Sequence, residues 1–136
     1  MSEDCLFCKI IDGEIPCSKV FENDKILAFL DINPVNKGHT LVIPKKHFET
    51  MIDMPEELAK DMVSVVQKMS ASVKKATIAD GFNIVMNNYR ASGQEVPHAH
   101  FHIIPRFDED DFPAWPHKKY KDKEMERYQE KIMEDE

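Results

Sequence analysis

The sequence predicts an α+β domain with a mainly antiparallel sheet, and three observations support this fold class. Several short apolar segments are separated by turn residues, as the strands of antiparallel sheets are. One long stretch places apolar residues at steps of three and four, which is typical of an amphipathic helix. The strand signals lie before and after this helix and do not alternate with further helices, so a parallel sheet is not favoured.

The first part of the chain predicts a short helix and three strands. Apolar residues at helical spacing over 7–11, followed by Gly13, indicate the helix. Asn23 and Asp24 form a turn pair between two apolar segments, which indicates a hairpin. Pro44 is expected to end the strand after the hairpin. The three strands are predicted over 20–22, 26–30 and 39–43.

The long helix is predicted from its start signal, its apolar stripe and its stop signal. Asp53 and Glu56 have the spacing of a capping box, and Pro55 occupies a permitted first-turn position. Gly81 is the expected C-terminal stop. The stripe consists of Leu58, Met62, Val65, Met69, Val73 and Ala76.

The remaining chain predicts two strands and a terminal helix. Strands are expected over 82–86 and 98–104, with a polar loop over 87–97 between them. Residues 118–136 are highly charged and predict an exposed helix with a thin apolar stripe. The stripe consists of Met125, Tyr128 and Ile132.

Length and composition limit the class of protein. The 136 residues fit one domain, and 42% apolar residues are enough to build a core. A formal net charge of −7 argues against a general nucleic-acid or anionic-membrane binder. No apolar run approaches the ~20 residues of a membrane span. The acidic start lacks the pattern of a secretory signal. We therefore expect a soluble, cytoplasmic protein without polymeric nucleic acid or membrane partners.

The three cysteines agree with that compartment. Cys5 and Cys8 form a C-x-x-C pair and Cys17 is separate. An odd number in a cysteine-poor chain does not indicate a secreted disulfide framework. A redox pair, two inert thiols and a metal site are the alternatives for the pair.

Three alternating histidines in the last predicted strand are the most informative feature. On a strand, His98, His100 and His102 line one face, while Phe101 and Ile103 face the core. Imidazoles titrate near neutral pH, bind metals and attack phosphorus. Solvated surface histidines, a three-histidine metal site and a nucleophilic site all fit this spacing.

Together with three other segments, these histidines resemble the histidine triad (HIT) family of nucleotide-binding hydrolases and transferases. The resemblance covers 5–106 and combines motifs at 5–11, 29–34, 38–47 and 98–104. It implies a HIT-like fold with one long helix and a C-terminal helix, and a sheet that joins a partner's sheet in a homodimer. We expect 1–106 to form the HIT domain and 107–136 to be a charged extension completing it.

The resemblance also implies the roles of individual residues. His100 would attack the α-phosphorus of a nucleotide and form a nucleotidyl-histidine, with His102 and His39 as the other catalytic residues. Asp31 would bind the ribose hydroxyls. The remaining substrate-binding positions are Phe7, Phe29, Ile32, Asn87, Gln94 and again His102. Phe29 and Ile32 could instead be core, Asp31 could cap a turn, and Asn87 and Gln94 could be ordinary loop residues.

Zinc and the substrate class are further expectations from the resemblance. In related proteins zinc is held by a C-x-x-C pair and two histidines, which here are Cys5, Cys8, His47 and His98. Such a four-ligand zinc is structural, since a catalytic zinc keeps an open position.

The sequence favours the branch that hydrolyses purine nucleoside phosphoramidates, because Asn87 stands where dinucleoside polyphosphate hydrolases tend to have Gln. Glu95 stands where close relatives often have a Ser, so the resemblance does not define which leaving group is preferred. The alternatives are a dinucleoside polyphosphate hydrolase, a regulatory nucleotide-binding module with little turnover, and a hydrolase that uses the three histidines to bind a catalytic metal.

Overall fold

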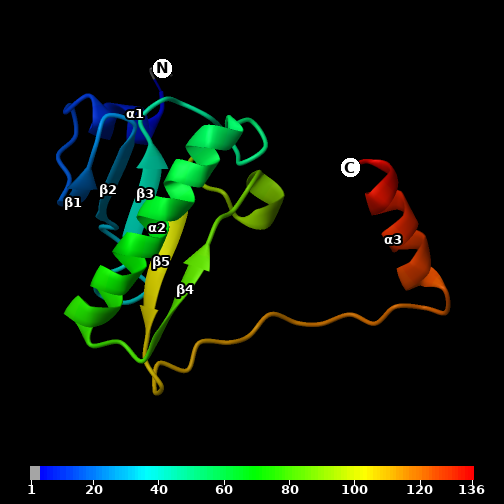
Figure 1. Ribbon diagram of the computed structural model, residues 1–136. Coiled ribbons are helices and arrows are strands. Elements are labelled where there is room, and N and C mark those ends of the chain that lie inside the picture. The colour runs from blue at the N-terminus through cyan, green and yellow to red at the C-terminus, as the bar shows by residue number, and fades with distance from the viewer. Residues whose placement is uncertain (1–3) are drawn as a thin grey trace.

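The computed structural model describes residues 4–136 and shows a five-stranded sheet with a helix on each face (Figure 1). The order along the chain is α1 (Leu6–Ile11), β1 (Lys19–Glu22), β2 (Ile26–Leu30), β3 (Thr40–Pro44), α2 (Glu56–Thr77), β4 (Gly81–Val85), a 3₁₀ turn (Arg90–Ser92), β5 (Phe101–Arg106) and α3 (Glu124–Glu134). The acidic start of the chain, on which the expectation of no secretory signal depends, lies mostly outside these residues. No helix within 4–136 is long and apolar enough to cross a membrane.

The sheet is antiparallel throughout, which confirms the predicted fold class. The strand order is β1-β2-β3-β5-β4, and every neighbouring pair is antiparallel. The hairpin of β1 and β2 forms as expected, because the Asn23 side chain accepts hydrogen bonds from the backbone N–H groups of Lys25 and Ile26. β4 and β1 are the two edge strands.

Two apolar clusters hold the sheet between its helices. α2 packs its buried stripe, which includes Met62 and Val66, against Val42 and Ile103 on one face. α1 covers the other face, where Phe7 packs with Phe29 of β2. Burial of this apolar surface is the main driving force for the arrangement.

The long helix forms, but both of its predicted end signals are wrong. Pro55 precedes the first turn without any side-chain cap, and the Asp53 carboxylate instead accepts hydrogen bonds from the N–H and the hydroxyl of Thr50. The helix ends at Thr77, because Ile78 adopts a left-handed conformation with φ 56°. Gly81 is the first residue of β4.

The predicted histidine strand begins three residues late. β5 starts at Phe101, so His98 and His100 precede the ladder. The N–H of Ala99 donates to the carbonyl of Phe48 and not to a strand neighbour. This contact ties the entry of β5 to the loop after β3. At its other end β5 continues through Pro105 to Arg106.

A close backbone approach fixes the start of β3. Gly38 has φ +100°, and a Cβ built on it would lie 2.5 Å from Thr77 Cγ2. Any other residue would therefore push the chain away from α2 immediately before His39. The glycine consequently helps to set the position of a candidate site residue.

The C-terminal segment leaves the body of the domain. Residues 107–123 contain no helix or strand and lead to α3, which stands apart from the sheet (Figure 1). α3 is shorter than the predicted 118–136, and none of its residues is buried. We call residues 107–136 the arm and residues 4–106 the body.

Candidate functional site

A cavity of about 420 Å³ opens beside α1, β2 and the loop that precedes β5. This volume lies within the usual range for small-molecule sites. One part of its wall is apolar and the other is polar. The apolar side chains include Leu6, Phe7, Ile10, Ile15, Phe29, Ile32, Leu41 and Val96. The polar side chains are Asp31, Asn33, Asn87, Glu95, His100 and His102.

One ring nitrogen of His100 makes a hydrogen bond to the backbone, and the other carries no proton. Its Nδ1 lies 2.7 Å from the carbonyl oxygen of His98 and must donate to it. The Nε2 is then the unprotonated nitrogen, on a ring that lines the cavity. Phe7 packs edge-on against this ring with a centroid distance of 5.0 Å, so the ring orientation is fixed by packing as well. The arrangement presents a neutral imidazole that can act as a nucleophile.

A chain of hydrogen bonds fixes the tautomers of His39 and His102. The backbone N–H of Val35 donates to His39 Nδ1 at 3.1 Å, so the proton of His39 is on Nε2. His39 Nε2 lies 2.9 Å from His102 Nδ1 and donates to it. His102 therefore carries its proton on Nε2. An Nε2–H group on the cavity wall is a donor suited to a phosphate oxygen.

Burial keeps these histidines neutral. The pKa of His102 is lowered to about 4, mainly by desolvation and then by the neighbouring His100 and His39, against a smaller opposing effect of the Asp31 carboxylate. Desolvation also lowers the pKa of His100, against smaller opposing effects of its hydrogen bond to His98 and of the Asp31 carboxylate. The pKa of His39 is lowered by burial and partly restored by Asp31. All three rings are consequently neutral at pH 7.

Asp31 reaches the site and also caps its own turn. One carboxylate oxygen accepts from the N–H of Asn33 at 2.9 Å, and the other lies 3.7 Å from His39 Nε2. Asp31 therefore both caps its turn and lines the cavity. Asp31, His39 and His102 could be grouped as metal ligands by distance. The hydrogen bonds of both histidine rings already account for their close approach.

Gln94 differs from the other expected substrate-binding residues, because it is not part of the cavity wall. It is 93% buried, and its amide bridges two loops. Its Nε2 donates to the carbonyl of Glu49 at 2.6 Å, and its Oε1 accepts from the N–H of Tyr89 at 2.7 Å. Sequence spacing could not reveal this bridge, because Glu49 is 45 residues away along the chain.

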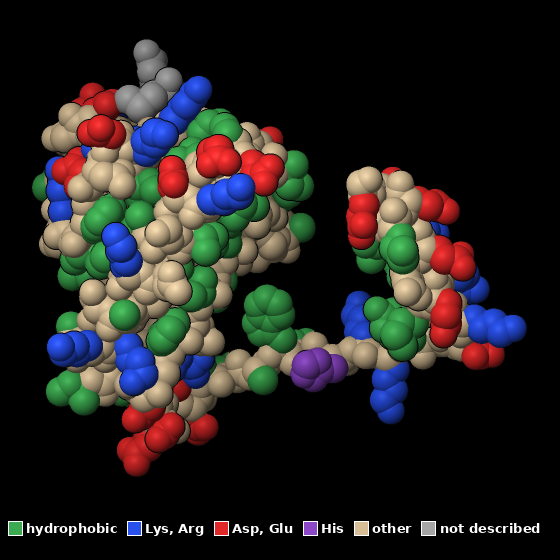
Figure 2. Space-filling model, in the orientation of Figure 1, with side chains coloured by type: hydrophobic (Ala, Val, Ile, Leu, Met, Phe, Trp, Pro, Cys, Tyr) green, Lys and Arg blue, Asp and Glu red, His purple; other side chains and the backbone are tan. Residues whose placement is uncertain are grey.

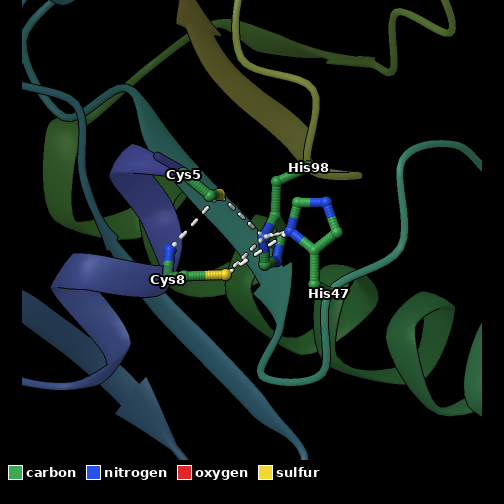
Figure 3. A group of neighbouring side chains, drawn as sticks. All are labelled: Cys5, Cys8, His47 and His98. Atoms are coloured by element: carbon green, nitrogen blue, oxygen red, sulfur yellow. Dashed lines mark hydrogen bonds between the residues drawn. The ribbon is translucent and has the colours of Figure 1, made fainter. Parts of the chain in front are cut away.

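A second cluster joins Cys5 at the N-cap of α1 and Cys8 within α1 to His47 and His98 (Figure 3). Their four candidate ligand atoms lie within 4.8 Å of one another. His98 donates from Nε2 to the carbonyl of Pro44 at 2.8 Å, which leaves its Nδ1 unprotonated toward the cysteines. Burial lowers the pKa of His98 to about 4. The cluster could hold a metal ion.

The spacing of these atoms fits a tetrahedral ion. Bonds of 2.0–2.3 Å to nitrogen and sulfur give edges of roughly 3.3–3.8 Å between ligand atoms. Here the Cys5 Sγ–His98 Nδ1 distance is 3.3 Å, Cys8 Sγ–His47 Nδ1 is 3.4 Å and Cys8 Sγ–His98 Nδ1 is 3.7 Å. The two histidine Nδ1 atoms are 3.1 Å apart. All four predicted metal ligands are therefore brought together.

The cavity wall also contains residues that sequence reasoning missed. Cys17 and Asn33 line it, as do Pro16 and Gly93. Cys17 follows α1 by six residues in a segment without regular structure, and no motif marked it. Cys17 reaches the cavity because this segment packs against the apolar cluster between α1 and β2.

Comparison with known proteins gives the same picture. The HIT domain family model matches residues 12–109. A HIT-like protein of Methanocaldococcus jannaschii is 56% identical over 106 residues, which are 78% of this chain and 81% of that protein. An adenosine 5′-monophosphoramidase of Schizosaccharomyces pombe is 44% identical over 117 residues, covering 82% of this chain and 85% of that protein.

Solved structures extend the likeness to the arm. A protein of Streptococcus mutans superposes with a TM-score of 0.93 and 43% identity, over 99% of this chain and 87% of that one. A score this high over nearly the whole chain requires the arm to follow a similar course there. With its histidines, its sheet and the matching family model, the chain belongs to the HIT domain family, the histidine triad proteins.

Proposed function

We propose that this protein is a nucleotide hydrolase that cleaves purine nucleoside phosphoramidates at the α-phosphorus, with His100 as the nucleophile. The observation that carries the proposal is the hydrogen bond from His100 Nδ1 to the carbonyl of His98, which leaves Nε2 unprotonated on a ring that lines the cavity. The S. pombe relative, a monophosphoramidase by name, supports the substrate class.

The reaction would occur in two displacements. His100 Nε2 forms a bond to phosphorus as the phosphorus–nitrogen bond of the substrate breaks, and the amine takes the electron pair and leaves with a proton from solvent. Water then attacks the phosphorus, the electron pair of the phosphorus–His100 bond returns to Nε2, and the attacking water gives one proton to solvent to yield the nucleoside monophosphate. His102 Nε2–H would donate to a phosphate oxygen in both steps, where negative charge has to be stabilised.

The apolar part of the cavity wall would bind the base of the nucleotide, and the polar part would bind its ribose and phosphate. The base would lie among the apolar residues that include Phe7, Phe29 and Ile32. The Asp31 carboxylate would accept hydrogen bonds from the ribose hydroxyls, and Asn87 would contact the phosphate. Gln94 would act from behind the wall, by holding the loop that carries Asn87 and Glu95.

The charge of the cavity favours an amine over a polyphosphate leaving group. Its lining residues include the carboxylates of Asp31 and Glu95 and no lysine or arginine within the part of the chain that the structure describes. A dinucleoside polyphosphate would bring several further negative charges to this wall without a cationic partner. A neutral or cationic amine would not meet that repulsion.

The metal of the second cluster would be zinc in a structural role. Two thiolates and two imidazoles are the usual ligands of tetrahedral structural zinc, and the interatomic distances fit its coordination sphere. Cys5, Cys8, His47 and His98 would hold the ion and thereby fix α1 and the entry of β5. No reaction step would pass through it, because four protein ligands leave no open position.

The quaternary state and the compartment complete the proposal. β4 is an open edge of the sheet, and two such edges can pair in a symmetric homodimer. We place the dimer in the cytoplasm, on the ground that the odd number of cysteines does not indicate a secreted disulfide framework.

Steady-state hydrolysis of an adenosine phosphoramidate tests the function. The wild-type protein is compared with His100→Ala and with the control His117→Ala, which removes an exposed histidine of the arm. We expect His100→Ala to lose at least a thousandfold in kcat/KM and the control to keep wild-type activity. Equal turnover by His100→Ala would refute the assignment. Tight binding of a mononucleotide without turnover by the wild type would favour a regulatory module.

A further inference from the structure

We propose that α3, at the end of the arm, docks on the body of a second copy of this chain, so that each copy of the dimer is held by the other's arm. This inference goes beyond the proposed function and rests on the proposed homodimer. It starts from a helix that touches nothing on its own body. Figure 2 shows α3 separated from the body by open space, joined to it by an extended segment.

α3 has an apolar face that lacks a partner. Met125, Tyr128, Ile132 and Met133 project on one side, and each is between 50% and 65% exposed. The opposite side is charged. An amphipathic helix normally buries such a stripe. Within residues 4–136, the ring contact of Tyr128 with Tyr120 is made inside the arm itself.

α3 is also too weak to be stable without a partner. It has 11 residues, and isolated helices below about 12–15 residues are marginal in water. Lys123 at its N-cap has φ 64°, and no side chain caps the first turn. Glu134 and the two acidic residues after it face the negative end of the helix dipole. Tertiary packing must therefore supply the stability.

The length and the direction of the arm indicate a second copy as the partner. The 17 residues of 107–123 can span about 55 Å when extended, which exceeds the roughly 35 Å diameter of a body of this size. The arm runs out on the side of β4, the open sheet edge (Figure 1). A copy paired at this edge would lie between α3 and its own body. The S. mutans relative shares the course of the arm.

The departure of the arm is rigidly set. Arg106 donates from Nε and Nη2 to the two carboxylate oxygens of Asp110, each at 2.8 Å. The same carboxylate accepts from the N–H of Phe107 and from Asn36 Nδ2. These bonds direct the chain away from its own body at the end of β5. A segment that only hung loose in solvent would not need this fixed direction.

Charge favours a protein surface over a membrane. Residues 124–136 carry six acidic side chains against two basic ones, which anionic lipid would repel. The second half of α2, in contrast, exposes Lys68, Lys74 and Lys75 with no acidic residue over 62–79. The acidic side of α3 and this basic surface on a second copy are complementary.

Lysine cross-linking of mixed-isotope dimers tests the inference. Unlabelled and ¹⁵N-labelled full-length chains are mixed in equal amounts by unfolding and refolding, and are then treated with a lysine-reactive cross-linker. We expect Lys131 to link to lysines of the body, with about half of the linked peptide pairs containing both isotopes. Linked pairs of one isotope only would show that α3 folds back on its own body and would overturn the proposal.

Variants on the two sides of α3 separate docking from chance proximity. Tyr128→Glu combined with Ile132→Glu should abolish these links and bring amide exchange in α3 to the rate of an unfolded peptide. The matched control, Arg127→Gln, changes the charged side of α3 without removing an acidic group and should keep both.

Two further outcomes would overturn the inference in distinguishable ways. A dimer by sedimentation whose α3 exchanges freely would mean that the arm is not docked, with the proposed dimer intact. A monomer at all concentrations would refute both the homodimer and the docking of α3. The proposed hydrolase activity would still be tested separately by His100→Ala.

Discussion

At the residue scale, two backbone groups decide which ring nitrogens of the site carry protons. The carbonyl of His98 sets the tautomer of His100, and the N–H of Val35 sets the tautomers of His39 and His102 through one chain of hydrogen bonds. Backbone groups thus set the protonation of the nitrogen atoms that we propose for catalysis. The sequence could indicate which histidines matter, but not which nitrogen of each carries the proton.

A substitution of Gln94 tests whether this side chain holds the loops beside the cavity in position. Gln94→Leu should remove the hydrogen bonds to the Glu49 carbonyl and the Tyr89 N–H, and should therefore destabilise the protein by about 1–3 kcal/mol. Urea unfolding measures this loss, with Gln67→Leu on the exposed side of α2 as the control. We expect kcat to fall while KM for the nucleotide changes little. A stable variant with raised KM alone would instead make Gln94 a direct substrate contact.

The buried histidines give a prediction about pH. The pKa of His102 is about 4 in the folded protein, below the ordinary value of about 6.5 that applies when the chain is unfolded. Between these values the unfolded state binds more protons, so the free energy of unfolding should decrease as pH falls from 6.5 to 4. Above pH 6.5 this contribution is fully present.

Comparison with a variant isolates the effect of one histidine. Denaturant unfolding of wild type and His102→Asn should show a pH slope that is smaller in the variant by up to about 1.4 kcal/mol per pH unit. The control His117→Asn, in the exposed arm, should keep the wild-type slope. Identical slopes for wild type and His102→Asn would contradict the burial of a neutral ring.

At the element scale, the six-residue helix α1 depends on the cluster that its cysteines form. So short a helix is not stable by itself. Cys5 at its N-cap accepts from the N–H of Cys8, and both side chains face His98. A metal bound there would join α1 to the start of β5 and to the loop after β3. Under the zinc proposal, the C-x-x-C motif would therefore stabilise the fold and would not take part in the reaction.

Removal of the metal is expected to loosen these elements first. After treatment with a strong chelator, or in Cys8→Ser, Tm should fall by several degrees and amide exchange should accelerate in α1 and over 45–50. Cys17→Ser should leave both unchanged, since Cys17 belongs to the cavity wall and not to the cluster. A protein purified without any bound metal, and indifferent to the chelator, would contradict the zinc proposal.

The elements also show where sequence reasoning succeeds and where it stops. Alternation and helical spacing located the five strands and the long helix, because burial of one face imposes these periods. The end of α2 was missed because Ile78 adopts a left-handed conformation that sequence rules reserve for Gly or Asn. The late start of β5 depends on the contact between Ala99 and Phe48, which is 51 residues away in the chain and has no local signal.

At the scale of the whole molecule, the body and the arm differ in how far the sequence predicts their structure. Of the thirteen expected site residues, four form the cluster of Cys5, Cys8, His47 and His98, and His39 is hydrogen-bonded to His102. All the others except Gln94 line the cavity: Phe7, Phe29, Asp31, Ile32, Asn87, His100 and His102. The resemblance to the HIT family predicted this grouping and motif spacing alone did not, because Cys5 and Cys8 lie on the short helix α1, far along the chain from His47 and His98. The course of the arm could not be predicted, because a thin apolar stripe on a charged helix does not specify what covers it.

The central claim is that His100 bonds to phosphorus during turnover, and acid-free quenching followed by mass spectrometry tests it most directly. The enzyme is mixed with excess adenosine phosphoramidate, stopped with alkaline denaturant within the first turnovers, and digested. We predict that the peptide containing His100 gains the mass of an adenylyl group, and that the peptide with His102 alone does not. Rapid turnover with no adduct at any time, in wild type and in a slowed His102→Asn variant alike, would contradict covalent catalysis by this ring.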